Sequence, residues 1–278
     1  MFDKIVWLNG MPRSGTSWLS QIFDSHPSVA FRLSPLFSYR FKNQVDSGSS
    51  LCEWRKFFEE VYKASDDGFI NQTDKREAGF YPTFERKDCN RNTLVIKDTR
   101  YHNLTSSVLE MFPDIRFIHI VRHPCAAINS WLRAPREFPQ NLNPLEQWRS
   151  GACRKTSKEE FWGFDDWVEL TKRYLDFEVE FPQQVKVISY DKLVRSPVAV
   201  VREMFDFVGM IIPQQTLDFL KISQESNVDS EYAVFKNKEQ VLNRWEAELH
   251  PQIIKEIKLI LSNTELECFV RPCNDPSL

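Results

Sequence analysis

The sequence predicts an α/β protein of the P-loop type, in which a central parallel sheet is flanked by helices to give three layers. Two observations support this prediction. Short apolar runs alternate with helical patterns along the chain, which is typical of a parallel sheet with right-handed crossovers. The first run also leads directly into a glycine-bounded loop, Gly10 to Gly15, and then into a helical pattern. A loop of this kind at a helix N-terminus is typical of a phosphate-binding site.

Five short runs of apolar residues are expected to form the strands. The fourth is the longest, and its apolar character is typical of a parallel strand that is buried on both faces. In chain order the five runs cover residues 5–8, 29–33, 93–97, 115–121 and 185–190.

Helical patterns occupy the intervals between these strands. After Gly15, apolar residues recur at helical spacing from Trp18 to Phe23, and Pro124 opens another helix that reaches Leu132. Further helices are expected over residues 51–64, 105–112, 165–181 and 197–208, and the remainder of the chain is mainly helical.

Ser34 followed by Pro35 is typical of a helix N-cap with proline at the first helical position. We therefore expect a helix from this point through Val45. The intervals 65–92 and 134–164 are polar or rich in proline, and they are expected to be loops, the first of them a mobile loop or lid.

The composition favours one globular domain over residues 1–278. Hydrophobic residues make up 42% and charged residues 27%, which is ordinary globular usage. The net charge of −3 argues against a general nucleic-acid-binding protein, which is normally basic. No apolar run approaches the length of a membrane span, and the six cysteines contain no C-x-x-C pair. We expect a cytoplasmic protein with reduced thiols and no membrane or nucleic-acid partner; the sequence does not indicate its oligomeric state.

Three strands end in polar residues that suit a phosphate site. They are followed by the loop 10–17, by Lys97 and Asp98, and by Arg122 and His123. Ligands of open parallel sheets bind at the carboxyl ends of the strands, so these residues are expected to converge there.

The loop itself differs from that of a nucleotide hydrolase. Where a hydrolase has Gly-Lys-Ser/Thr, this chain has Gly15-Thr16-Ser17, and the lysine that would reach a terminal phosphate is missing. Arg13 supplies a cation from within the loop instead. The loop is therefore expected to hold a phosphate in a different way from an ATPase.

These residues resemble the sulfotransferases that use 3′-phosphoadenosine 5′-phosphosulfate (PAPS). Residues 12–18, Pro-Arg-Ser-Gly-Thr-Ser-Trp, look like their 5′-phosphosulfate loop. Residues 120–130 look like their 3′-phosphate motif, in which an arginine at a strand end and a serine eight residues later grip the phosphate. Residues 187–191 resemble the later strand whose tyrosine lies near adenine. Residues 235–238 occupy the place of a basic loop, although the family's Arg-Lys-Gly sequence is absent.

The resemblance implies in-line transfer of a sulfuryl group from PAPS to a small-molecule acceptor, without a metal. Arg13 would stabilise the charge that develops on the leaving 5′-phosphate, and Lys97 would act on the sulfuryl oxygens. The residues that would bind PAPS are Arg13, Ser14, Gly15, Thr16, Ser17, Trp18, Arg122, Ser130, Tyr190 and Lys236.

The general base departs from the family pattern. Many relatives have a histidine just after the third strand, where this chain has Thr99, and others have a glutamate after the second strand, where it has Ser34. The remaining candidates near the strand ends are Asp98 and His102, with His123 less favoured.

The pattern around the loop also resembles bacterial tailoring enzymes of secondary metabolism, including cyanobacterial sulfotransferases of saxitoxin-type toxin biosynthesis. That resemblance implies a hydroxyl or an amine- or guanidinium-type nitrogen as the acceptor. Two other functions stay open. A P-loop kinase using ATP would need the loop lysine and a Walker B aspartate, and both are missing here. A non-catalytic nucleotide-binding module would be consistent with Thr99 and Ser34 at the usual positions of the base.

Overall fold

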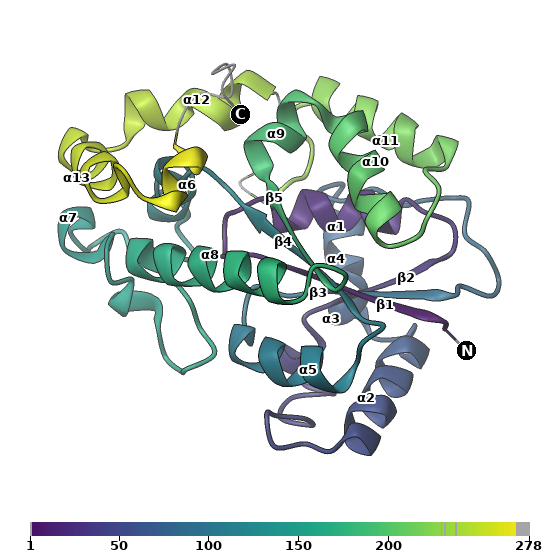
Figure 1. The fold of residues 1–278 in the computed structure, drawn as a ribbon. Coiled ribbons are helices and arrows are strands. Elements are labelled where there is room, and N and C mark those ends of the chain that lie inside the picture. The colour runs from purple at the N-terminus through teal and green to yellow at the C-terminus, as the bar shows by residue number, and fades with distance from the viewer. Residues whose placement is uncertain (1, 229, 231, 237, 271–278) are drawn as a thin grey trace.

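A computed structural model describes residues 2–228, 230, 232–236 and 238–270. Its centre is a sheet of five parallel strands in the order β2-β3-β1-β4-β5 (Figure 1). All five strand predictions are confirmed, except that Tyr190 begins the helix α9 instead of ending the last strand. The strands are β1 (Lys4–Asn9), β2 (Val29–Leu33), β3 (Thr93–Lys97), β4 (Arg116–Val121) and β5 (Val185–Ser189).

The register of the sheet brings the polar strand ends to one edge. Leu8 of the central strand β1 lies opposite Lys97 of β3 and opposite Ile118 of β4. The loop that begins at Gly10 therefore leaves the sheet beside the ends of both neighbouring strands. This alignment places the chain around Lys97 and Arg122 next to the loop.

Helices cover both faces of the sheet, so the predicted three-layer fold is confirmed (Figure 1). Successive side chains of a strand point to opposite faces. Trp7 accordingly packs in the core on one face, and Val6 and Leu8 pack in the core on the other. The Trp7 face is covered by α2 (Leu51–Lys63), α5 (Thr105–Met111) and α8 (Gly163–Glu180). The opposite face is covered by α1 (Thr16–Asp24), α9 (Tyr190–Arg195), α10 (Pro197–Phe207) and α11 (Gln214–Glu225).

A group of three helices packs together at one end of the molecule: α6 (Pro124–Leu132), α12 (Lys238–Glu248) and α13 (Pro251–Leu261). Glu248 joins α12 to α6, because it accepts a hydrogen bond from Asn129 Nδ2 at 2.9 Å and lies 2.7 Å from Arg133 Nη1. Within the described residues, no helix combines the length and the apolar character that a membrane span requires.

The helix expected after Ser34 does not form. The structure has a single 3-10 turn, Pro35–Phe37, and Ser34 adopts a left-handed backbone with φ of +36°. Its amide donates to Lys97 O at 2.8 Å and its hydroxyl donates to Asp98 Oδ1 at 3.2 Å. The serine is thus bonded to the end of β3, so its hydroxyl does not cap a helix. The two expected loops contain the short helices α3 (Gly68–Asn71), α4 (Thr73–Glu77) and α7 (Pro144–Gln147).

Candidate active site

The loop between β1 and α1 is built as an anion cradle. Arg13 and Gly15 have left-handed backbones, with φ of +71° and +92°, and Ser14 N donates to Met11 O at 3.2 Å to close the turn. Gly15 is the N-cap of α1, and no side chain caps the helix there. The first amides of a helix have no partner within the helix, and the helix dipole adds partial positive charge. This helix N-terminus can therefore take an anion.

Two glycines of the loop are required by close packing. A Cβ atom on Gly15 would lie 2.2 Å from Tyr190 Cδ2, and a Cβ atom on Gly10 would lie 2.6 Å from Ile120 O. Non-bonded carbon atoms normally lie about 3.5–4.0 Å apart. The loop is therefore held tightly between β4 and the tyrosine of α9.

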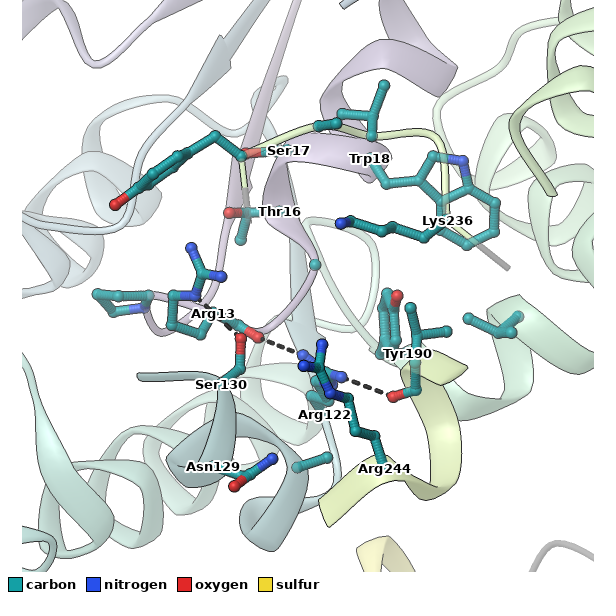
Figure 2. Close-up of a pocket in the computed structure, with 18 of the residues that line it drawn as sticks. Arg13, Thr16, Ser17, Trp18, Arg122, Asn129, Ser130, Tyr190, Lys236 and Arg244 are labelled. Atoms are coloured by element: carbon teal, nitrogen blue, oxygen red, sulfur yellow. Dashed lines mark hydrogen bonds between the residues drawn. The ribbon is translucent and has the colours of Figure 1, made fainter. Parts of the chain in front are cut away.

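Arg122, at the end of β4, connects this loop to α12 (Figure 2). Its Nη1 donates to Arg13 O at 3.1 Å and its Nη2 donates to Val241 O at 2.6 Å. The guanidinium also lies 5.0 Å from the centre of the Tyr190 ring. One arginine thus contacts the loop, the later helix and the aromatic wall of the site.

Arg13 brings the loop into contact with α6 (Figure 2). Its Nε donates to Ser130 Oγ at 3.0 Å, and its Nη1 lies 3.6 Å from Glu137 Oε2. Its guanidinium also lies 5.7 Å from the centre of the Tyr232 ring. The arginine of the first motif and the serine of the second are therefore in direct contact.

These elements enclose a cavity of about 270 Å³, close to the lower end of the usual range for small-molecule sites. Trp18 and Tyr190 form an aromatic part of its wall, with ring centroids 6.1 Å apart. Among the described residues that line it, seven are cations and one is a carboxylate, so the cavity suits a polyanion. They are Arg13, Lys75, Lys97, Arg122, Arg133, Lys236, Arg244 and the carboxylate Glu137.

Lys97 is buried, and it is one of the residues that line the cavity. Burial lowers the pKa of its ammonium group to about 8, and the charge of Lys75 acts in the same direction. The charges of Asp98 and Glu137 raise the pKa and oppose this effect. Lys97 is consequently a cation at neutral pH that loses its proton only slightly above it.

A model of the sulfotransferase family matches residues 6–214, which is most of the chain. The chain belongs to the sulfotransferase family. A putative protein-tyrosine sulfotransferase of Caenorhabditis briggsae is 22% identical to it over 217 residues, which is 78% of this chain and 69% of the relative.

Solved structures share the fold of this sulfotransferase. The match to a mouse sulfotransferase complexed with PAP covers 96% of this chain and 89% of the mouse chain, with a TM-score of 0.61 and 16% sequence identity. The match to the sulfotransferase domain of the Synechococcus olefin synthase covers 98% of this chain and 96% of that domain, with a TM-score of 0.55 and 18% sequence identity.

The structure gathers ten of the thirteen site residues predicted for this sulfotransferase around the cavity. They are Arg13, Gly15, Thr16, Ser17, Trp18, Lys97, Arg122, Ser130, Tyr190 and Lys236. Ser14, Asp98 and His102 are not among the residues that line it, and all three are buried.

Asp98 faces the protein and not the cavity. Its Oδ1 accepts hydrogen bonds from the amides of Thr99 and Arg100, at 2.9 and 3.0 Å, and from the Ser34 hydroxyl. Burial raises the pKa of its carboxyl to about 6 against these hydrogen bonds. Its Oδ1 thus fixes the turn after β3, and the carboxylate does not line the cavity.

His102 also points away from the cavity. Its Nδ1 lies 3.1 Å from Tyr174 OH, and its ring packs edge-on against Phe161. Burial lowers the pKa of the imidazole to about 3. Nearby Tyr174 also bonds to Asn9 and Thr105, so His102 belongs to a polar cluster inside the core. The geometry gives the sequence-based expectation of a base at Asp98 or His102 no support.

Several residues at the cavity were not found from the sequence. Lys75 and Arg244 come from segments without a recognisable motif, and Glu137 comes from an interval expected to be a loop. In the sequence Glu137 follows Arg136 and belongs to no helical or strand pattern. Only its contact with Arg13 in the structure distinguishes it from a surface carboxylate.

Proposed function

We propose that this sulfotransferase transfers the sulfuryl group of PAPS to a small-molecule acceptor. The observation that supports it most is the presence of two anion-binding units around one cavity. The first is the uncapped loop with Arg13, and the second is the pair Arg122 and Ser130. The mouse relative was solved with PAP, adenosine 3′,5′-bisphosphate, which is PAPS without its sulfuryl group. A donor with two anionic ends fits two such units.

In the proposed reaction, the loop amides and Arg13 hold the 5′-phosphosulfate, and Arg122 and Ser130 hold the 3′-phosphate. Lys97 neutralises charge on the sulfuryl oxygens. The acceptor atom forms a bond to sulfur while the bridging S–O bond breaks, and the bridging electrons pass to the 5′-phosphate. Such loose transfer depends mainly on positioning and electrostatic stabilisation, which these cations supply.

We infer that the adenine lies against Tyr190 and Trp18, because these rings form the aromatic part of the cavity wall. We also infer that residues 1–278 act as one domain, since the cavity draws on residues from Pro12 to Trp245. The resemblance to bacterial tailoring enzymes supports a cytoplasmic enzyme of secondary metabolism. Its acceptor would be a hydroxyl or an amine- or guanidinium-type nitrogen, as in saxitoxin-type toxin biosynthesis.

Ligand binding tests this proposal. PAP, AMP and ATP with magnesium are compared by thermal shift and by titration calorimetry, and PAP is expected to bind tighter than AMP. Arg122→Ala should lose that preference, because one hydrogen bond to a charged group contributes about 1.5–3 kcal/mol, or roughly 10- to 150-fold in affinity. Arg149→Ala is the control, since Arg149 is exposed, pairs with Asp165 and does not line the cavity.

Three results would contradict the proposal. The first is equal stabilisation by PAP and AMP. The second is stabilisation by ATP with magnesium but not by PAP. The third is an unchanged preference for PAP over AMP in Arg122→Ala. Transfer of labelled sulfuryl from PAPS to a panel of phenols, alcohols, amines and guanidines then separates an enzyme from a non-catalytic nucleotide-binding module.

A further inference from the structure

Glu137 is the single carboxylate among the described residues that line the cavity. Sulfuryl transfer to a neutral hydroxyl or nitrogen needs a group that accepts the proton of the acceptor. Every other ionisable lining residue except tyrosine is a lysine or arginine, which donates hydrogen bonds and is charged at neutral pH. Glu137 is thus the lining residue whose chemistry suits this task.

The position of the carboxylate leaves it able to accept a proton. Glu137 Oε2 lies 3.6 Å from Arg13 Nη1 and accepts no hydrogen bond from any residue that the structure describes. The side chain is 22% exposed, so it is sheltered but not sealed from the cavity. An ionised carboxylate has about four lone-pair sites. Oε2 itself is buried, so an acceptor reaches the carboxylate from the part of the side chain that is exposed.

The main chain holds Glu137 in place. After α6 the chain turns, with Glu137 N donating to Ala134 O at 2.8 Å and Trp131 Nε1 donating to Glu137 O at 3.1 Å. Trp131 is buried and packs edge-on against Phe138, the next residue along the chain. Both flanks of the glutamate are therefore anchored in the core, which fixes the main chain from which its side chain extends.

Glu137 also lies near the atoms that react. Its charge acts on Lys97, where it counteracts the effect of burial on the pKa of the ammonium group. It also pairs with Arg13. These are the two cations assigned above to the sulfuryl oxygens and the leaving phosphate, so an acceptor that approaches sulfur between them comes within reach of the carboxylate.

We propose that Glu137 is the general base of the transfer, an assignment that rests on the proposed function. The acceptor proton passes to Glu137 as the bond from the acceptor atom to sulfur forms. The S–O bond breaks, and its electrons remain on the 5′-phosphate. The base thus comes from the turn after α6, whereas Ser34 and Thr99 occupy the two positions where relatives have a base.

The pairing with Arg13 gives this assignment a distinctive consequence. Glu137 holds the guanidinium of Arg13 in the absence of a donor, and it competes for that guanidinium with the phosphosulfate of a bound donor. Removing the charge of Glu137 should therefore leave donor binding unchanged or make it tighter, while the chemical step becomes slower. A residue that only positioned Arg13 would change binding and turnover in the same direction.

The experiment measures PAP formation from PAPS in a mixture of 4-methylphenol, phenethylamine and phenylguanidine, so that transfer to any of them, or to water, is detected. Glu137→Gln should turn over about 10²- to 10⁴-fold more slowly than the wild-type protein, the usual contribution of a general base. Its PAP affinity should be equal or higher, and added formate should partly restore Glu137→Ala. Glu146→Gln is the matched control, because Glu146 is exposed on α7 and does not line the cavity.

Turnover by Glu137→Gln within threefold of the wild-type rate would overturn the assignment and leave the proposed function intact. A slower Glu137→Gln that also binds PAP tenfold more weakly would make Glu137 a positioning residue and overturn its role as base. A wild-type protein that forms no PAP from PAPS in this mixture would overturn both proposals.

Discussion

Replacement of Gly15 by alanine tests how tightly the loop is packed. The new Cβ would lie 2.2 Å from Tyr190 Cδ2 and 2.3 Å from Cε2, so the tyrosine ring or the loop must move by more than 1 Å to reach a normal contact of about 3.5 Å. The backbone of Gly15, with φ of +92°, is also one that alanine adopts only with strain.

The expected loss of stability has two parts. A left-handed backbone costs a residue with a side chain about 1–2 kcal/mol. Forcing a buried ring aside costs about 1–3 kcal/mol, because Tyr190 is 7% exposed and is packed edge-on against Trp18. Gly15→Ala should therefore lower the free energy of unfolding by about 2–5 kcal/mol, measured by urea unfolding followed through tryptophan fluorescence.

A double-mutant cycle separates the two parts. In a Tyr190→Ala background the ring is absent, so Gly15→Ala should cost only the backbone part of about 1–2 kcal/mol. Gly10→Ala is the matched control, because its Cβ would meet the main-chain oxygen of Ile120 and not Tyr190. Its cost should be the same in both backgrounds. An equal cost of Gly15→Ala with and without the tyrosine ring would refute the steric explanation.

Two further predictions concern buried charges. Burial lowers the pKa of Lys97 to about 8, so kcat/KM for PAPS should fall as pH rises through about 8, because the ammonium group becomes neutral. Lys97→Arg should abolish this fall, since arginine stays charged. A fall at the same pH in that variant would contradict the role assigned to Lys97. Asp24→Asn should lower the free energy of unfolding by about 3–5 kcal/mol, since Asp24 lies 2.7 Å from both Arg76 and Lys87 in a nearly buried cluster. Asp165→Asn removes one partner of the exposed Arg149–Asp165 pair and should lower the free energy of unfolding by at most about 1 kcal/mol. Equal losses for Asp24→Asn and Asp165→Asn in urea unfolding would show that burial does not determine the loss of stability.

The strands and the anion-binding loop could be predicted because their signals are local. The β1–loop–α1 unit is contiguous, and the run that forms β4 is apolar enough to identify a buried strand. The sheet edge then follows from a general rule, since parallel strands present their carboxyl ends together. For this reason Lys97 and Arg122, distant from the loop in sequence, could be placed beside it.

Contacts that depend on distant partners could not be predicted. His119 lies within β4, and its Nδ1 is 2.8 Å from Asn9 Oδ1, while its ring stacks on Tyr174 at 3.8 Å between centroids. Asn9 in turn donates to the hydroxyl of Tyr174 on α8. No spacing along the chain indicates that these three polar residues form one buried cluster at the end of β1.

The position of the general base depends in the same way on distant contacts. Asp98 and His102 follow a strand that ends at the site, but proximity along the chain does not determine where a side chain points. The turn after β3 directs Asp98 toward the amides of Thr99 and Arg100, and His102 toward the core. Glu137 reaches the cavity from a turn whose sequence has no motif.

The charge of the cavity is opposite in sign to that of the chain as a whole. Its described lining residues carry a net charge of +6, whereas the complete chain carries −3, so the rest of the molecule carries −9. A polyanionic donor is therefore attracted to the cavity, while the rest of the molecule carries a net charge of the same sign as the donor. Such guidance acts on the rate of encounter and is screened by salt. We expect added salt to lower the association rate constant of the donor far more than it changes the dissociation rate constant.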